Sequence, residues 1–263
     1  MKLNIKKHIP NAITSGNLLC GCLALVKAFE GDLVWASYLV GIALILDFFD
    51  GFSARLLNVS SAIGKDLDSL ADMVTFGVVP GVIMFKVIET TRVLSMTVGG
   101  DIPGIASVAN ENAIFWPAYF SFIIPIFSAI RLAKFNNDVR QSDSFIGLPT
   151  PANAIFICSL PLIFSIDHTF LSKEYNLGFT GVILNPYFLC ALSLVLSILL
   201  IAELPLIALK FKNFGWADNK IRFVFLGLSV VLLIAFQFIG IPLVIILYIL
   251  LSIVNNMFLK KKV

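Results

Sequence analysis

The sequence of residues 33–56 is LVWASYLVGIALILDFFDGFSARL. About 20 apolar residues are enough for one helix to cross the hydrocarbon core of a bilayer, and this stretch reaches that length. Asp47 and Asp50 interrupt it toward its end. An aspartate at the centre of a spanning helix costs about 2.5–3.5 kcal/mol to insert. The stretch therefore predicts a membrane helix whose acidic side chains have a purpose beyond packing.

The rest of the chain has the same apolar character. Of its 263 residues, 59% are hydrophobic and 13% are charged, whereas soluble domains are roughly 45–50% apolar and about 25% charged. This composition excludes a soluble globular enzyme. It predicts an all-α bundle of eight membrane-spanning helices, and leaves no room for a sizeable domain outside the membrane. The predicted spans are 12–29, 33–56, 67–88, 113–135, 151–166, 186–209, 222–239 and 241–258.

The basic residues predict the orientation of these spans. With the N-terminus in the cytoplasm, most of the 19 lysines and arginines fall on the inner side, as expected for an even number of spans. We therefore expect a protein of the cell inner or plasma membrane, with both termini on the cytoplasmic side. The net charge of +3 is too small to argue for nucleic acid binding. The N-terminus is expected to be that of the mature chain, because no cleavable segment follows its basic opening.

Two stripes of small and acidic residues run along the second and third predicted spans. In the second span, Asp47 and Asp50 are three residues apart and therefore share one helix face. At the start of the third span, a glycine just before it and two aspartates repeat at intervals of four, which keeps them on one face of the same helix. The stripes consist of Asp47, Asp50, Gly51 and Ala54 in one helix, and of Gly64, Asp68 and Asp72 in the other.

Four carboxylates at membrane depth would cost roughly 10 kcal/mol if nothing compensated them. Facing stripes would form a cage of oxygen ligands, which suits Mg²⁺ or Mn²⁺. Two such ions about 3.5–4 Å apart favour displacement at phosphorus. Arg55 follows the first stripe and is either a residue that sets orientation or a phosphate clamp. A cation- or proton-coupled transporter is the alternative class, because intramembrane acids serve transport too.

The two stripes resemble the signature of the CDP-alcohol phosphatidyltransferases, D-x2-D-G-x2-A-R-x8-G-x3-D-x3-D, and match it without a gap over residues 47–72. The resemblance implies two bound divalent ions and a lipid nucleotide substrate. It further implies that Asp72 is the general base as well as a metal ligand. The implied metal ligands are Asp47, Asp50, Asp68 and Asp72, and the implied binding residues for the CDP-lipid are Gly51, Ala54, Arg55, Gly64 and Lys65.

Four other stretches resemble one branch of that family, the membrane-embedded phosphatidylserine synthases. This resemblance implies transfer of the phosphatidyl group of CDP-diacylglycerol to the hydroxyl of L-serine, giving phosphatidylserine and CMP. A sister enzyme that uses glycerol 3-phosphate or inositol phosphate is the alternative within the family. The four stretches are PNAITSGN at 10–17, ADMVTFGVVP at 71–80, RLAKFN at 131–136 and FIGLPTP at 145–151.

The candidate serine pocket follows from where these stretches fall. All four lie at predicted cytoplasmic helix ends. The carboxylate of serine needs a cation, and Arg131 and Lys134 are the nearest by topology, although both could simply set orientation. Asn11, Thr14 and Asn17 repeat every three residues and could present polar groups to cytidine or serine. They could equally be capping or helix-packing groups.

We expect the chain to form a single membrane domain over residues 1–263. The catalytic core helices cover 11–166, and additional C-terminal helices cover 186–258. The implied partners are CDP-diacylglycerol, L-serine and membrane lipids. Homodimers are common in the family, so a homodimer is expected here.

Overall fold

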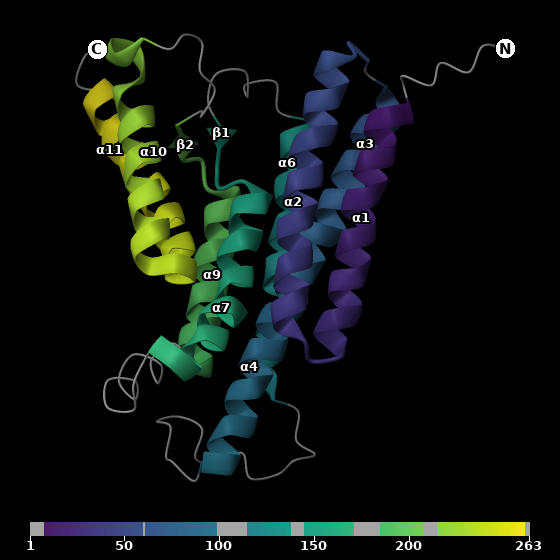
Figure 1. Ribbon diagram of the computed structural model, residues 1–263, viewed down its shortest axis with the longest axis vertical. Helices are drawn as coiled ribbons and strands as arrows, with labels where there is room; N and C mark the ends of the chain where they lie inside the picture. Colours follow the sequence, from purple (N-terminus) through teal and green to yellow (C-terminus); the bar gives the residue numbers. More distant parts are fainter. Residues whose placement is uncertain are drawn as a thin grey trace, which may run out of the picture.

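The structure is a computed structural model in which residues 8–59, 61–98, 115–137, 145–170, 185–207 and 215–260 are described. Almost all of them are helical, and the helices form an elongated bundle (Figure 1). This confirms the predicted all-α membrane class. Within the described residues, five helical stretches are long and apolar enough to span a membrane, and two are shorter, so a count of eight spans stays a prediction. The five are His8–Phe29, Leu33–Leu56, Ala62–Arg92, Trp116–Asn137 and Asn219–Asn256.

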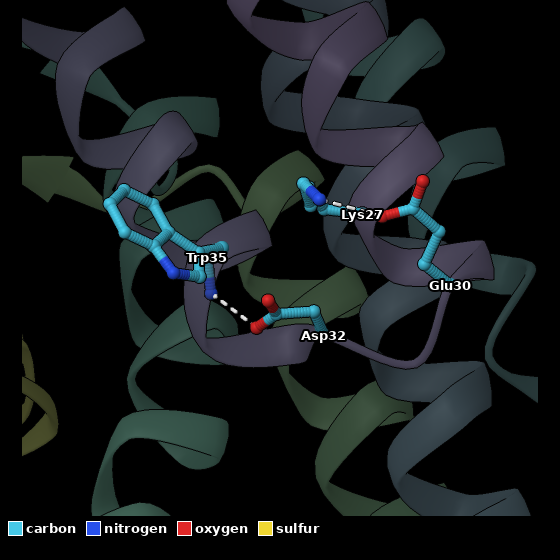
Figure 2. Close-up of polar contacts among 4 residues, drawn as sticks. All are labelled: Lys27, Glu30, Asp32 and Trp35. Carbon is cyan, nitrogen blue, oxygen red and sulfur yellow. Dashed lines mark hydrogen bonds and ion pairs between the residues drawn. The ribbon is translucent and has the colours of Figure 1, made fainter.

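The first two helices, α1 (His8–Phe29) and α2 (Leu33–Leu56), form a hairpin (Figure 1). Their turn contains Gly31, whose φ of +86° favours glycine. Asp32 caps α2 by accepting a hydrogen bond from the backbone nitrogen of Trp35 at 3.1 Å (Figure 2). Lys27 and Glu30 form an ion pair at 2.7 Å beside it. These contacts order the end of the hairpin that is remote from Asp47 and Asp50.

The third span is a continuous rod of three parts. Helix α3 (Ala62–Asp72) is capped by Ser61, whose hydroxyl accepts a hydrogen bond from the backbone nitrogen of Gly64 at 3.0 Å. A π-helical segment, η2 (Met73–Val78), follows Asp72 directly, and α4 (Val79–Val98) continues from it. π-helical turns are rare and frequently lie at functional sites. Fully buried side chains of η2 and α4 form the centre of the bundle, among them Phe76, Ile83, Met84 and Ile88.

The predicted span 113–135 corresponds to the candidate membrane span Trp116–Asn137, although a turn interrupts its helix. The structure has a short helix, α5 (Trp116–Phe120), then a turn, and then α6 (Ile123–Asn137). Pro125 explains the break, because its ring would clash with the carbonyl four residues earlier in an uninterrupted helix. Residues 113 and 114 lie outside the described part of the chain. Helix α6 then runs to Asn137 and packs along η2 and α9.

Helices α7 (Thr150–Phe170) and α9 (Pro186–Ile201) complete the core. The predicted span 186–209 is too long, because the helix ends at Ile201. Strand β2 (Pro205–Leu206) then pairs antiparallel with β1 (Phe145–Ile146). A residue before proline is disfavoured in helical conformation, so Pro205 opposes continuation. The backbone nitrogen of Gly147 donates to Leu204 at 2.9 Å, which further fixes the extended segment.

Polar side chains of α11 (Gly240–Lys260) satisfy the backbone of this extended segment. The hydroxyl of Tyr248 donates to the carbonyl of Ile207 at 2.9 Å, and the hydroxyl of Ser252 accepts from the backbone nitrogen of Ile207 at 3.2 Å. Asn256, one turn further on, donates to the carbonyl of Pro205. Non-helical backbone at membrane depth is tolerated only where protein groups satisfy it. The hydrogen bonds from these α11 side chains therefore explain how β2 and the residue after it fit between helices.

The last two helices form a hairpin at one edge of the bundle, and α1 and α3 lie at the other edge (Figure 1). Helix α10 (Trp216–Phe236) is joined to α11 by a 3-10 turn, η3 (Gln237–Ile239). The predicted spans 222–239 and 241–258 place the connection between them at residue 240, whereas the turn in the structure lies at Gln237–Ile239, slightly earlier in the sequence. Helix α1 begins, and α11 ends, at the same end of the bundle (Figure 1). Which side of the membrane this end faces stays a prediction.

Candidate functional site

Helices α2 and α3 bring three of the motif aspartates together. One carboxylate oxygen from each of Asp47, Asp50 and Asp68 lies within 4.8 Å of the other two. Three carboxylates at this separation repel one another, and a cation between them removes the repulsion. The donor set consists of oxygen atoms only, which is the set that Mg²⁺ and Mn²⁺ prefer. The residues present therefore fit a hard divalent ion.

The fourth motif residue, Asp72, lies one turn beyond Asp68 at the end of α3. It is not one of the three converging acids, although its carboxylate lies beside that of Asp47. The side-chain nitrogen of Asn17 donates to Asp72 Oδ1 at 3.3 Å. Asp72 is therefore at the edge of the acidic cluster, held by a neutral donor from α1.

Helix α1 also contacts the acidic cluster through Thr14. The hydroxyl of Thr14 lies 2.7 Å from Asp50 Oδ2 and 3.0 Å from the carbonyl of Pro10. Thr14 is 3% exposed, so water does not compete for this contact. Hydrogen bonds to the far side of a ligating carboxylate orient it and tune its affinity. Thr14 therefore contributes to the position of Asp50 rather than only to helix packing.

A cavity of about 260 Å³ opens next to the aspartates, between α1, α2 and α3. Its walls combine small residues, which leave space, with polar groups and two of the acids. This agrees with the two stripes predicted from the sequence, which were expected to face each other. The lining residues are Pro10, Asn11, Thr14, Asp50, Gly51, Ala54, Val59, Ser61, Gly64, Lys65 and Asp68.

The residues implied to bind the CDP-lipid are not all equally close to this cavity. Gly51, Ala54, Gly64 and Lys65 line it, whereas Arg55 is not among the described residues that do so. Arg55 lies exposed in the last turn of α2. The amine of Lys65 donates to the carbonyl of Asn136 at 3.2 Å. Lys65 thus stands between the cavity and the end of α6.

The candidate serine residues separate into two groups. Asn11 and Thr14 line the cavity itself. On α6, Arg131 is 5% exposed, with its guanidinium 5.3 Å from the centre of the Phe135 ring, whereas Lys134 is exposed. The sequence does not distinguish these two cations as serine ligands, because both lie at the same predicted cytoplasmic helix end. Their different burial makes Arg131 the stronger candidate for an internal ligand.

A link between α3 and α6 was missed in the sequence. The side-chain nitrogen of Asn136 donates to Ser69 Oγ at 2.8 Å, so the end of α6 is tied to the acidic helix. Asn136 belongs to the stretch 131–136, but its partner lies 67 residues away in the chain. No local pattern identifies such a pair. Ser61, which lines the cavity and caps α3, could have been found, since serine is a favoured capping residue.

Comparison with known proteins identifies the family. A family model described as CDP-alcohol phosphatidyltransferase matches residues 7–254. The chain is 34% identical to the CDP-diacylglycerol--serine O-phosphatidyltransferase of Helicobacter pylori strain J99 over 70% of this chain and 69% of that protein. It is 34% identical to the Bacillus subtilis strain 168 protein of the same name, over 55% of this chain and 70% of that protein.

An archaeal relative is more distant. The archaetidylserine synthase of Methanothermobacter thermautotrophicus is 26% identical, over 59% of this chain and 58% of that protein. The names of all three relatives contain serine. The family model covers nearly the whole chain, and the aspartates of the family signature converge beside a cavity. The chain belongs to the CDP-alcohol phosphatidyltransferase family.

Proposed function

We propose that this chain transfers the phosphatidyl group of CDP-diacylglycerol to the hydroxyl of L-serine, releasing CMP and forming phosphatidylserine. The observation that carries the proposal is the convergence of Asp47, Asp50 and Asp68 beside a cavity lined by small residues. Membership of the family supports the phosphatidyl transfer. The names of the relatives support serine as the acceptor.

Asp47, Asp50, Asp68 and Asp72 would hold the divalent ions, Mg²⁺ or Mn²⁺ and two in number, with Asp72 contributing from the edge of the site. When bound, such ions neutralise the charge of a diphosphate and so favour departure of CMP. Gly51 and Ala54 leave space for the cytidine. Arg55 and Lys65 supply positive charge for the phosphates, and Gly64 lets α1 and α3 approach closely enough to close the cavity.

Asp72 is the proposed general base. It accepts the proton of the serine hydroxyl as the serine oxygen attacks the phosphorus that bears the diacylglycerol. A new oxygen–phosphorus bond forms, and the bond between that phosphorus and the CMP oxygen breaks. The position of Asp72 beside the three converging acids supports this division of labour.

The lipid chains need not leave the membrane during this reaction. Phe48 and Phe52 lie on α2 between and beside the aspartates, are exposed, and stack with ring centres 6.4 Å apart. An exposed aromatic face suits contact with acyl chains. We therefore propose that CDP-diacylglycerol enters laterally from the inner leaflet, with its head group in the cavity. The cytoplasmic location of the site and a homodimer are part of this proposal.

Gly51 tests the proposed location of the nucleotide. A Cβ atom added at Gly51 meets no protein atom within 4 Å, and Gly51 lines the cavity. Gly51→Val is therefore expected to fold normally but to weaken CDP-diacylglycerol binding at least about tenfold, the equivalent of 1.4 kcal/mol. Gly41→Val is the matched control, since Gly41 lies on the same helix with equally open surroundings away from the cavity. Equal affinities of the two variants would contradict the assignment.

Arg131 tests the serine pocket, which we propose to include Arg131 and Lys134 on one side and Asn11, Thr14 and Asn17 on the other. A buried charge-assisted hydrogen bond contributes about 1.5–3 kcal/mol, so Arg131→Ala is expected to raise the KM for serine by roughly 10- to 100-fold. The KM for CDP-diacylglycerol should stay the same. Two controls test whether the effect comes from lost packing. Arg131→Lys keeps a positive charge at this position, and a melting curve measures the stability of each variant. An unchanged serine KM in a folded variant removes Arg131 from the pocket.

The function itself is tested by CMP release from the purified chain with CDP-diacylglycerol and a divalent ion. Serine, glycerol 3-phosphate, inositol phosphate and no acceptor are compared in parallel. Release that depends on serine supports the proposal. Release with another acceptor contradicts the choice of serine but keeps the phosphatidyl transfer. Failure to release CMP with every metal and acceptor contradicts the proposed reaction, and solute flux would then be measured to test transport.

A further inference from the structure

Helix α1 directs two buried donors at two different aspartates. Thr14 and Asn17 are three residues apart and so share a helix face. Thr14 contacts Asp50 of α2 at 2.7 Å, and Asn17 contacts Asp72 of α3 at 3.3 Å. Asn17 is fully buried. The two donors therefore act on different parts of the proposed machinery, since Asp50 belongs to the converging acids and Asp72 does not.

Close packing fixes the contact between Asn17 and Asp72. Gly21 lies one turn beyond Asn17 on α1, and a Cβ added there would lie 3.2 Å from the Cα of Thr75 and closer still to its hydroxyl. Thr75, which follows Asp72 in the π-helical segment, donates to the backbone carbonyl of Asn17 at 3.3 Å. The backbones of α1 and η2 thus meet at Gly21. The position of the Asn17 backbone is therefore fixed by the packing of α1 against η2.

The amide of Asn17 is paired at one end only. Its nitrogen donates to Asp72, whereas its oxygen is buried and has no hydrogen-bond partner among the described residues. A buried amide that serves packing alone normally has partners at both ends. The terminal torsion of an aspartate is soft, so an unheld carboxylate rotates easily. The donor on Oδ1 restrains this rotation.

We propose that Asn17 is a positioning residue for Asp72, and that its donor to Oδ1 holds the carboxylate in the orientation in which it takes the proton of the acceptor hydroxyl. This inference rests on the proposed function, in which Asp72 is the base. It assigns Asn17 an action through Asp72, whereas the sequence suggested direct contact with serine. Thr14 acts in the same way on Asp50, and therefore on the metal site.

The test compares Asn17→Leu, Thr14→Val and Ser15→Ala in the full-length chain. Asn17→Leu removes the donor at similar volume. It is expected to lower kcat by roughly 10- to 100-fold, part of the 10²–10⁴-fold effect of a positioned base. Serine KM and the Kd for Mn²⁺, measured by electron paramagnetic resonance, should both stay within about threefold. Thr14→Val is expected to raise the Mn²⁺ Kd by about 10- to 100-fold. Ser15, whose exposed hydroxyl bonds only within its own helix in the described structure, is the control.

Two further variants guard against a folding defect. Asn17→Asp keeps the shape but not the donor, and it should lose turnover like Asn17→Leu. Asn17→Gln keeps an amide donor and should retain more turnover than either. Unchanged kcat in folded Asn17→Leu or Asn17→Asp, or a matching rise in the Mn²⁺ Kd, overturns the inference. If the unaltered chain lacks serine-dependent CMP release, the proposed function fails. If it has that activity and the Asn17 variants match it, only this inference fails.

Discussion

Replacing Asp72 with asparagine is expected to lower the turnover number by about 10²–10⁴-fold, the usual contribution of a positioned general base. Asparagine preserves the shape of the side chain but cannot take the serine proton. CDP-diacylglycerol binding should change little, because Asp47, Asp50 and Asp68 converge without Asp72. Single-turnover CMP release and equilibrium binding of CDP-diacylglycerol measure the two effects separately.

Asp66→Asn is the matched control for this variant. Asp66 lies on the same helix and is exposed, so its charge is removed without altering the acidic cluster. Turnover of Asp66→Asn should stay close to that of the unaltered chain. A fall in CDP-diacylglycerol affinity for Asp72→Asn as large as its fall in turnover would assign Asp72 to binding instead of proton transfer.

Replacing Asp50 with asparagine is expected to have the opposite pattern. Asp50 is one of the three acids whose oxygens lie within 4.8 Å of one another, and asparagine removes one of the negative charges that attract the ion. Loss of a hydrogen-bond partner around a metal ligand typically costs 10- to 100-fold in affinity. Loss of a ligand charge should therefore cost at least about 100-fold, and metal-dependent binding of CDP-diacylglycerol should be lost with it.

Mn²⁺ titration of the purified chain, followed by electron paramagnetic resonance with and without CDP-diacylglycerol, measures this loss. A melting curve accompanies it, because Asp50 is 6% exposed and accepts a hydrogen bond from Thr14. Asparagine can keep that bond through its own oxygen, so the fold should persist. Similar, mild losses of turnover in Asp50→Asn and Asp72→Asn would refute the separate assignments of the two residues.

The acidic site shows which contacts can be predicted from the spacing of residues along the chain and which cannot. Intervals of three and four residues predicted that Asp47 and Asp50 share one face, and that Gly64 and Asp68 share another. The structure confirms that these faces meet, since Asp50, Gly64 and Asp68 line one cavity. The spacing could not tell that three acids converge while Asp72 lies to one side. That difference depends on how side chains of separate helices meet, as Asn17 of α1 does with Asp72.

The errors in the predicted helices have the same origin. The apolar run over 186–209 is compatible with a single span, yet the helix ends at Ile201 because β2 pairs with β1, and Ile207, directly after β2, bonds to Tyr248 and Ser252 of α11. These partners are distant in sequence. Proline was the only local sign of the break, as it was for the turn before α6.

The sequence by itself determined the membrane class, the main helices and the residues that carry the family chemistry. These properties depend on hydrophobicity and on spacing along one helix, which are local. Only the tertiary structure decided that Thr14 contacts Asp50, that Asn17 contacts Asp72 and that Arg131 is buried while Lys134 is exposed. Those properties depend on how helices pack, because a side chain meets its partner only where two backbones, here at Gly21 and Thr75, come close enough.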